Sequence, residues 1–210
     1  MTRSNNHAPV VVLVNLKGGT GKTTLAVHIA EDLKASLVDL DPQGDAADWA
    51  TRSGRVSASK AHGWEEALAM VESARSQSAV VVDCPPREGP ELRAALSVAS
   101  VAVIPAKGSM QDLRAVGRMV ELVGEARAHG NPSLRVGLVL NEARSITTMA
   151  GAAAEALQQV KGAHYLGHLG LRQAFVETFA AGQAVHSGPA RKEMKALLEH
   201  LHTLIRRSKP

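Results

Sequence analysis

The sequence is poor in aromatic residues, in cysteine and in long apolar runs. Aromatic side chains make up only 2% of the 210 residues, so the chain has little material for a surface on which unpaired bases could stack. The single cysteine, Cys84, cannot form a disulfide within the chain, and it cannot alone hold a structural zinc or iron–sulfur centre. No apolar run approaches the roughly 18 residues of a membrane span, and we find no export signal. These absences favour a soluble protein of the reducing cytoplasm.

The chain does have enough apolar residues for a core, and its charge is unevenly distributed. Hydrophobic residues make up 45% of the sequence, and the formal net charge is +4. From residue 161 onward there are eight Lys or Arg against three Glu, whereas the first 160 residues are almost neutral. A basic C-terminal quarter suits a surface that binds a polyanion, although charge alone equally fits anionic lipid or a solvated helix.

Short β-branched runs alternate with longer stretches of helical periodicity along the chain. We expect strands at Val10–Val14, Ser36–Leu40, Ala79–Asp83, Val101–Pro105, Arg135–Leu140 and His164–Leu169. We expect helices at Thr23–Leu33, Trp64–Arg75, Glu91–Val98, Gln111–Ala128, Thr147–Gln159, Gln173–Ala181 and Ala190–Arg206, and a loose connection at Thr51–Gly63. This alternation predicts a single α/β domain over residues 1–210, flexible at 1–8, with a mostly parallel twisted sheet and helices on both faces.

The first expected strand is followed by a glycine-rich loop, Lys17-Gly18-Gly19-Thr20-Gly21-Lys22-Thr23-Thr24. Its glycines let consecutive backbone N–H groups surround a phosphate at the point where a helix begins. Lys22 supplies a positive charge for the outer phosphates, and the Thr23 hydroxyl is placed to ligate Mg²⁺. The sequence therefore predicts a P-loop that binds nucleotide through residues 17–24.

Two departures from an ordinary P-loop identify a branch of these proteins. Leu16 stands where the first glycine is usual, and an additional lysine, Lys17, follows it. In this form the loop resembles the deviant Walker A box of the ParA/MinD family of ATPases. The resemblance implies ATP as substrate, Mg²⁺ as cofactor and a weak intrinsic rate of hydrolysis. It also implies an ATP-sandwich homodimer in which Lys17 reaches the partner's nucleotide; a lysine solvated at the loop edge is the alternative.

Three further segments extend the resemblance. Residues 38–44 resemble the family's second box, in which Asp41 orients the attacking water, while Asp39 either supports it or is purely structural. Residues 80–86 begin with an apolar run that ends in Asp83. This segment resembles the Walker B motif, whose carboxylate lies near Mg²⁺ and usually contacts it through a water. Asn141 follows another apolar run, and its amide would read the adenine edge unless it merely caps a turn. The implied catalytic residues are Lys17, Lys22 and Asp41.

Within the family, the chain most resembles the short, plasmid-type ParA (ParF-like) group. This implies a partition or positioning ATPase whose ATP-bound dimer binds duplex DNA without sequence preference on the nucleoid. A ParB-like or other adaptor would stimulate hydrolysis and so release the DNA. Arg172 is the first candidate DNA contact, and Arg206, Arg207 and Lys209 could extend the surface.

A MinD-like ATPase that binds membrane through its C-terminal helix is the rival interpretation. Leu197, Leu201 and Leu204 share one face of that helix, next to basic residues. We expect this face to pack on the sheet instead, which makes a membrane partner the less favoured reading.

Overall fold

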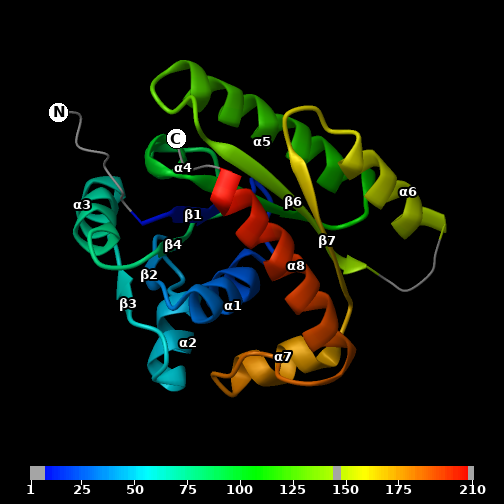
Figure 1. Cartoon of the computed structure of the whole chain (residues 1–210), viewed down its shortest axis with the longest axis horizontal. Coiled ribbons are helices and arrows are strands. Elements are labelled where there is room, and N and C mark those ends of the chain that lie inside the picture. Colours follow the sequence, from blue (N-terminus) through cyan, green and yellow to red (C-terminus); the bar gives the residue numbers. More distant parts are fainter. Residues whose placement is uncertain (1–7, 144–147, 208–210) are drawn as a thin grey trace.

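The structure, a computed structural model, describes residues 8–143 and 148–207 (Figure 1). Within these residues one parallel sheet is formed by seven strands in the spatial order β3-β2-β4-β1-β5-β6-β7. The strands are β1 (Val10–Leu13), β2 (Ser36–Asp39), β3 (Ala58–Lys60), β4 (Val80–Asp83), β5 (Val101–Ala106), β6 (Arg135–Ala143) and β7 (His164–Gly170).

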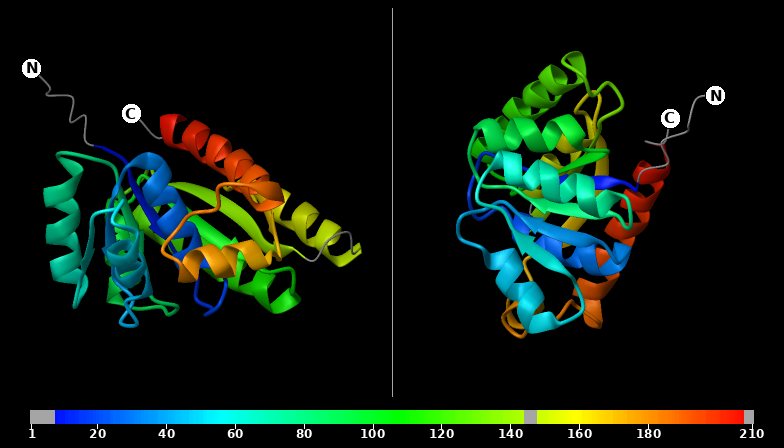
Figure 2. Two further views of the ribbon diagram at one scale, coloured as in Figure 1. Left: turned by 90° about the horizontal axis from the view of Figure 1, so that it is seen from below. Right: turned by 90° about the vertical axis from the view of Figure 1, so that its left-hand side faces the viewer.

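The helices form a layer on each side of this sheet, as Figure 2 shows. One face is covered by α3 (Trp64–Arg75), α4 (Pro90–Val98), α5 (Met110–Ala128) and α6 (Thr148–Gln158). The other is covered by α1 (Lys22–Leu33), α2 (Asp45–Ser53), α7 (Gln173–Ala180) and α8 (Gly188–Arg207). The predicted class, a mostly parallel α/β sheet with helices on both faces, is confirmed.

Strand β1 lies at the centre of the sheet and is fully buried. Val10 and Val12 point into the core under α3–α6, while Val11 and Leu13 point into the core under α1, α2 and α8. A strand buried on both faces needs apolar residues at consecutive positions, which is why this segment is a continuous run and does not alternate.

The expectation of a loose connection at Thr51–Gly63 was wrong. Helix α2 extends to Ser53, and Ala58–Lys60 forms the edge strand β3, which pairs with β2. The strand is only three residues long and its sequence, Ala-Ser-Lys, has no apolar run, so sequence periodicity could not reveal it. The expected helix start at Thr147, the flexible N-terminus up to residue 7 and the basic Lys209 lie outside the described residues.

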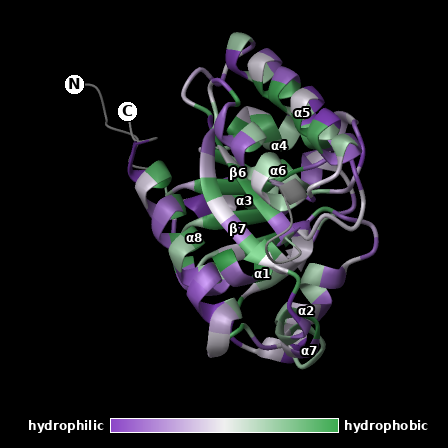
Figure 3. Ribbon diagram, turned by 90° about the vertical axis from the view of Figure 1, so that its right-hand side faces the viewer, coloured by the Kyte–Doolittle hydropathy of each residue, from purple (hydrophilic) through white to green (hydrophobic). Residues whose placement is uncertain are grey.

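Helix α8 packs its apolar face on the sheet. Leu197, Leu201 and Leu204 are all buried in the core beneath it, and Figure 3 shows hydrophilic residues along the outer side of this helix. The face on which a membrane anchor would depend is therefore already occupied. Among the described residues, no helix combines the length and the hydropathy required to cross a bilayer.

A buried histidine ties the first helix to the segment that follows α7. His28 is 3% exposed; its Nδ1 lies 2.7 Å from the Thr24 carbonyl oxygen, and its Nε2 accepts a hydrogen bond from the Val185 N–H at 3.1 Å. Because the Val185 N–H can only donate, the ring is neutral, with its proton on Nδ1. Burial accordingly lowers the pKa of His28.

We expect this histidine to make the protein sensitive to mild acid. A lowered pKa in the folded state means that the His28 contribution is complete above the ordinary pKa of about 6.5 and is lost as the pH falls below it, by at most about 1.4 kcal/mol per pH unit. His28→Ala should lower the free energy of unfolding at neutral pH by about 2–3 kcal/mol, because it leaves a buried N–H unpaired.

Denaturant unfolding at about pH 7.5 and about pH 5.5 measures both effects, since only the lower value lies in the range where histidine titrates. His62→Ala, which removes an exposed histidine, is the control. A His28→Ala variant that lost as much stability on acidification as the wild type would contradict the assignment.

Candidate nucleotide-binding site

The site lies at the carboxyl edge of the sheet, where three neighbouring strands end together. In the strand register, Asp83 on β4 lies beside Leu13 on β1 and beside Asp39 on β2. The loops that follow these strands therefore meet at one place. It is also the place where the chain switches direction across the sheet, because β1 is flanked by β4 on one side and β5 on the other.

The glycine-rich loop connects β1 to α1 and is held in place from both sides. Asn15 donates its amide to the Pro105 carbonyl at 2.6 Å and accepts the Lys17 N–H at 3.0 Å. Gly21 has φ 93°, and a Cβ there would lie 2.1 Å from the Asn141 amide nitrogen, so this position requires glycine. Helix α1 begins at the next residue, and its free N–H groups point toward the loop.

Lys22, the first residue of α1, is a buried cation. It is 6% exposed, and within the described part of the chain its ammonium donates only a long hydrogen bond, 3.4 Å, to the Lys17 carbonyl. Burial lowers the pKa of Lys22, while the nearby carboxylates of Asp83 and Asp41 oppose that shift. A buried ammonium with unused protons is costly, and phosphate oxygens would satisfy it.

Asp83 is a buried acid, and neither of its carboxylate oxygens makes a hydrogen bond of good geometry among the residues that the structure describes. Burial raises its pKa to about 7, and the neighbouring Thr23 hydroxyl and, less strongly, the charge of Lys22 oppose that rise. Such an orphaned carboxylate fits a hydrated divalent cation. The residues present therefore fit Mg²⁺: the Thr23 hydroxyl would ligate the ion, and Asp83 would hold it through a water.

Asp39 shapes the loop that carries Asp41. The Asp39 carboxylate is fully buried and accepts the N–H groups of Asp41 at 3.0 Å and Ala47 at 2.9 Å. Lys60 on β3 holds the same loop from outside, donating to the Pro42 carbonyl at 2.8 Å. Asp39 is thus a positioning residue, and Asp41 is left at the surface of the site. The sequence did not identify Lys60, because it belongs to the undetected strand.

Lys17 binds an acid of its own chain. Its ammonium lies 2.6 Å from Asp112, which is 2% exposed. Asp112 also completes a capping box with Ser109 at the start of α5. Although burial favours the neutral acid, the bonds from Lys17 and Ser109 lower the pKa of Asp112. Sequence reasoning missed Asp112, although the Ser-x-x-Asp pattern before a helix was a usable signal.

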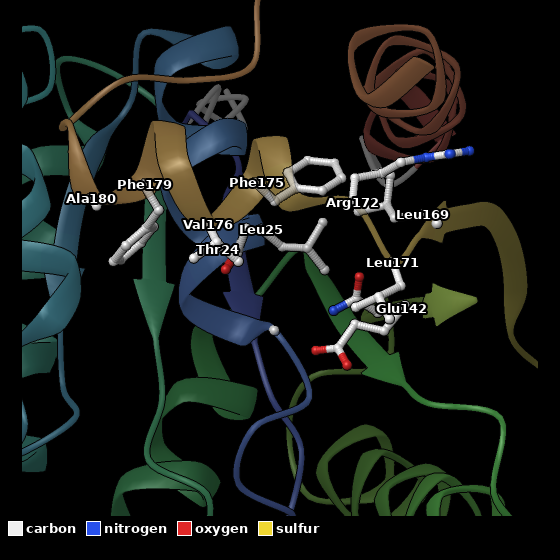
Figure 4. A pocket seen from close by; sticks show the side chains of 13 residues that line it. Thr24, Leu25, Glu142, Leu169, Leu171, Arg172, Phe175, Val176, Phe179 and Ala180 are labelled. Atoms are coloured by element: carbon white, nitrogen blue, oxygen red, sulfur yellow. The ribbon is translucent and has the colours of Figure 1, made fainter. Parts of the chain in front are cut away.

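A cavity of about 350 Å³ opens beside the glycine-rich loop, between α1, the ends of β6 and β7, and α7 (Figure 4). Its lining is mostly apolar and includes Leu25, Leu171, Phe175 and Val176. Asn141 also lines it and donates its amide to the Thr20 carbonyl at 2.8 Å. An apolar cavity next to a phosphate loop has the character of a site for a base and sugar.

The structure separates the three predicted DNA contacts that lie within the described residues. Arg172 borders the cavity, but its guanidinium points away toward α8, where it meets Glu193 at 2.6 Å (Figure 4). Arg206 and Arg207 lie at the far end of that helix. At 1.5 Å per residue, they are about 20 Å from Glu193 along the helix axis.

Comparison with known proteins defines the class. The family model for the CobQ/CobB/MinD/ParA nucleotide binding domain matches residues 11–185, and the chain belongs to this family. It is a ParA/MinD-type ATPase of the partition or positioning kind. ATP and Mg²⁺ are the nucleotide and the metal ion that fit this family.

Individual relatives agree with this class. The chain is 33% identical to Maintenance of carboxysome distribution protein A of Halothiobacillus neapolitanus, over 70% of this chain and 73% of the relative. Its fold is similar to that of the McdA–ATP complex from Cyanothece, with a TM-score of 0.77 and 15% identity over 95% of this chain and 97% of that one. A plasmid partition protein from Borrelia burgdorferi bound to AMPPNP gives a TM-score of 0.74 and 16% identity, over 93% and 99% of the two chains.

We expect Mg²⁺-dependent ATP binding to weaken in mild acid. The raised pKa of Asp83, about 7, means that its carboxylate is progressively protonated below that pH, and a neutral acid holds a hydrated cation poorly. Affinity should fall by up to about tenfold per pH unit below the pKa.

Titration with a fluorescent ATP analogue and Mg²⁺ measures this dependence. Asp83→Asn should bind more weakly and lose the part of the pH dependence that belongs to the protein, whereas Asp45→Asn, at an exposed position, should behave as wild type. Parallel pH profiles for Asp83→Asn and the wild type would contradict the role of Asp83.

Proposed function

We propose that this ATPase works as an ATP-switched homodimer that binds duplex DNA without sequence preference and segregates a plasmid or chromosome, or positions another large cargo. The observation that carries the proposal is the pair of loop lysines. The Lys22 side chain lies within its own phosphate loop, whereas the Lys17 side chain leaves the loop and forms an ion pair with Asp112, which a stronger anion could replace. We further propose that residues 1–210 act as one such unit.

The chemistry of hydrolysis follows from the groups that surround the phosphates. Lys22 and the N-terminus of α1 neutralise the phosphates, so that charge developing on the leaving oxygens is stabilised. Asp41, held by the loop that Asp39 organises, accepts a hydrogen bond from the attacking water and orients it. Mg²⁺, when bound, withdraws charge from the phosphate oxygens. Asn141 and the apolar cavity hold the adenine.

Lys17 would contact the nucleotide of the partner subunit. In the single chain its charge is neutralised by Asp112, and that bond must open before Lys17 can reach a phosphate. A γ-phosphate carries more charge than a carboxylate and can compete with Asp112 for Lys17. ADP has no phosphate at that position, so we expect the exchange only when the triphosphate is present. This makes dimerisation depend on ATP and gives a slow basal rate, because the site is complete only in the dimer.

DNA binding would follow from charge. The protein has a formal net charge of +4, concentrated in its C-terminal quarter, and lysine or arginine on phosphates carries no sequence information. A relative is named for carboxysome distribution and a structural neighbour for plasmid partition, which supports the positioning of cargo over the nucleoid. A ParB-like or other adaptor would stimulate hydrolysis and reverse the switch. The MinD-like alternative is weakened by the buried apolar face of α8.

We expect Lys17→Ala to abolish ATP-dependent dimerisation. Sedimentation velocity with ATP and Mg²⁺ measures it, in an Asp41→Ala background that preserves the triphosphate. Asp112→Asn, which keeps the hydrogen-bonding shape but frees Lys17, should dimerise at a several-fold lower protein concentration. Lys192→Ala removes an exposed lysine elsewhere and is the control. Unimpaired dimerisation of Lys17→Ala would exclude the sandwich arrangement.

We expect Asp41→Ala to bind ATP and to hydrolyse it at least about tenfold more slowly, because the water is no longer oriented. With this variant, an electrophoretic shift of unrelated duplex DNA should occur with ATP and not with ADP or without nucleotide. Equal shifts in all three conditions would refute the switch. Sedimentation with anionic liposomes in place of a DNA shift would favour the membrane alternative.

A further inference from the structure

The edge of the sheet opposite the nucleotide site is strongly basic. It is formed by the last turn of α5, the starts of β6 and β7 with the loops before them, and the end of α8. We name it the distal basic edge and define it by five residues: Arg127, Arg135, Lys161, Arg206 and Arg207.

Direct contacts hold these segments together. The Arg127 guanidinium donates to the Leu134 carbonyl at 2.9 Å and to the Gly162 carbonyl at 3.2 Å. Arg135 donates to the carbonyl of Arg207, the last residue of α8, at 3.2 Å. Residues that are far apart in the sequence are thus fixed on one surface, although three of the five side chains, Lys161, Arg206 and Arg207, remain exposed.

The positive charge of this edge is not neutralised. The segments 127–135, 159–164 and 203–207 contain no Asp or Glu, and no carboxylate pairs with Arg127 or Arg135 within the described part of the chain. Burial and the charge of Arg135 together lower the pKa of Arg127. By contrast, Arg93, Arg118 and Arg172 all form ion pairs with Glu.

The edge is also hollowed. A cavity of about 470 Å³ is lined by Arg127, Arg135, Gly162 and His164, among others. Two neighbouring guanidinium groups at a cavity are suited to an anionic oxygen ligand such as a phosphate.

We propose that the distal basic edge binds the phosphodiester backbone of duplex DNA. This inference rests on the proposed DNA-binding function. It keeps Arg206 and Arg207 of the predicted contacts, leaves out Arg172, and adds Arg127, Arg135 and Lys161 on the side of the sheet opposite the nucleotide site. A membrane is the less suitable partner, because the exposed large apolar residues of the described chain, Trp64, Met110, Leu171 and Val176, all lie outside these three segments.

The location suggests how ATP controls DNA binding. Strand β6 separates the two edges by about 25 Å, so DNA and nucleotide do not compete for the same groups. A dimer joined through the nucleotide edges carries two distal basic edges on its outer sides. A dimer with two weak DNA-binding surfaces has a much higher avidity for DNA than a monomer with one, because the second contact is intramolecular. Dimerisation alone therefore switches DNA binding on.

The test removes three charges from the exposed part of the edge. Lys161→Gln/Arg206→Gln/Arg207→Gln is compared with Arg191→Gln/Lys192→Gln/Lys195→Gln, which loses the same charge from exposed positions near the other end of α8. Both are made in the Asp41→Ala background, and sedimentation with ATP verifies that each is folded. Fluorescence anisotropy with a labelled random-sequence duplex then gives the dissociation constant at several salt concentrations.

We expect the first triple variant to bind DNA at least about tenfold more weakly, with a salt dependence shallower by about 2–3 in log–log slope per subunit, while the matched variant stays within about twofold of its parent. Equal loss in both variants, or no loss in the first, would overturn the inference while leaving DNA binding intact. Absence of DNA binding by the parent would overturn both proposals. Binding of the parent to anionic vesicles in place of DNA, lost in the first variant, would identify a membrane partner.

Discussion

Leu13, Asp83 and Asp39 lie side by side on β1, β4 and β2, and this register decides where the charged groups of the site stand. The three strands are buried on both faces, so a slip of one residue would exchange the residues that enter the two cores. The carboxylates at the strand ends are thereby fixed beside the glycine-rich loop. The Asp39 carboxylate then holds the loop of Asp41, while the Asp83 carboxylate has no hydrogen bond of good geometry to the described residues.

The free chain keeps two opposite buried charges incompletely satisfied. Among the described residues, the Lys22 ammonium makes one long hydrogen bond, and the Asp83 oxygens make none of good geometry. Both costs are removed by a magnesium–triphosphate ligand, so nucleotide binding should stabilise the fold as well as assemble the site. The charge of Lys17 is already paired with Asp112, so Lys17 does not carry this cost. Its ion pair opens only when a stronger anion takes the place of Asp112.

Sequence reasoning succeeded where the signal was local and failed where it was not. The glycine-rich loop and the strand end at Asp83 are contiguous patterns, and the structure brings them together at one edge. β3 has three residues without an apolar pattern, so both the strand and Lys60 were missed. The cavity wall on α7 and the Lys17–Asp112 pair depend on contacts between distant segments. The excess of basic residues in the C-terminal quarter was noticed. That Arg172 lies beside Glu193 near one end of α8, while Arg206 and Arg207 lie at the other end, could be seen only in the structure.

The most direct test of a shared nucleotide site is the ATPase rate of a mixture of Lys17→Ala and Asp41→Ala subunits, each nearly inactive alone. If Lys17 acts on the partner's nucleotide, a mixed dimer has one site with both groups intact and is held by one remaining Lys17–nucleotide contact. An equimolar mixture at high protein concentration should therefore hydrolyse ATP well above the sum of the two variants, with roughly a quarter of the wild-type rate as the upper limit, reached if half of the dimers are mixed and one of two sites works. If Lys17 served its own subunit, every site would lack one group. No recovery above the sum of the two variants would then contradict the shared site.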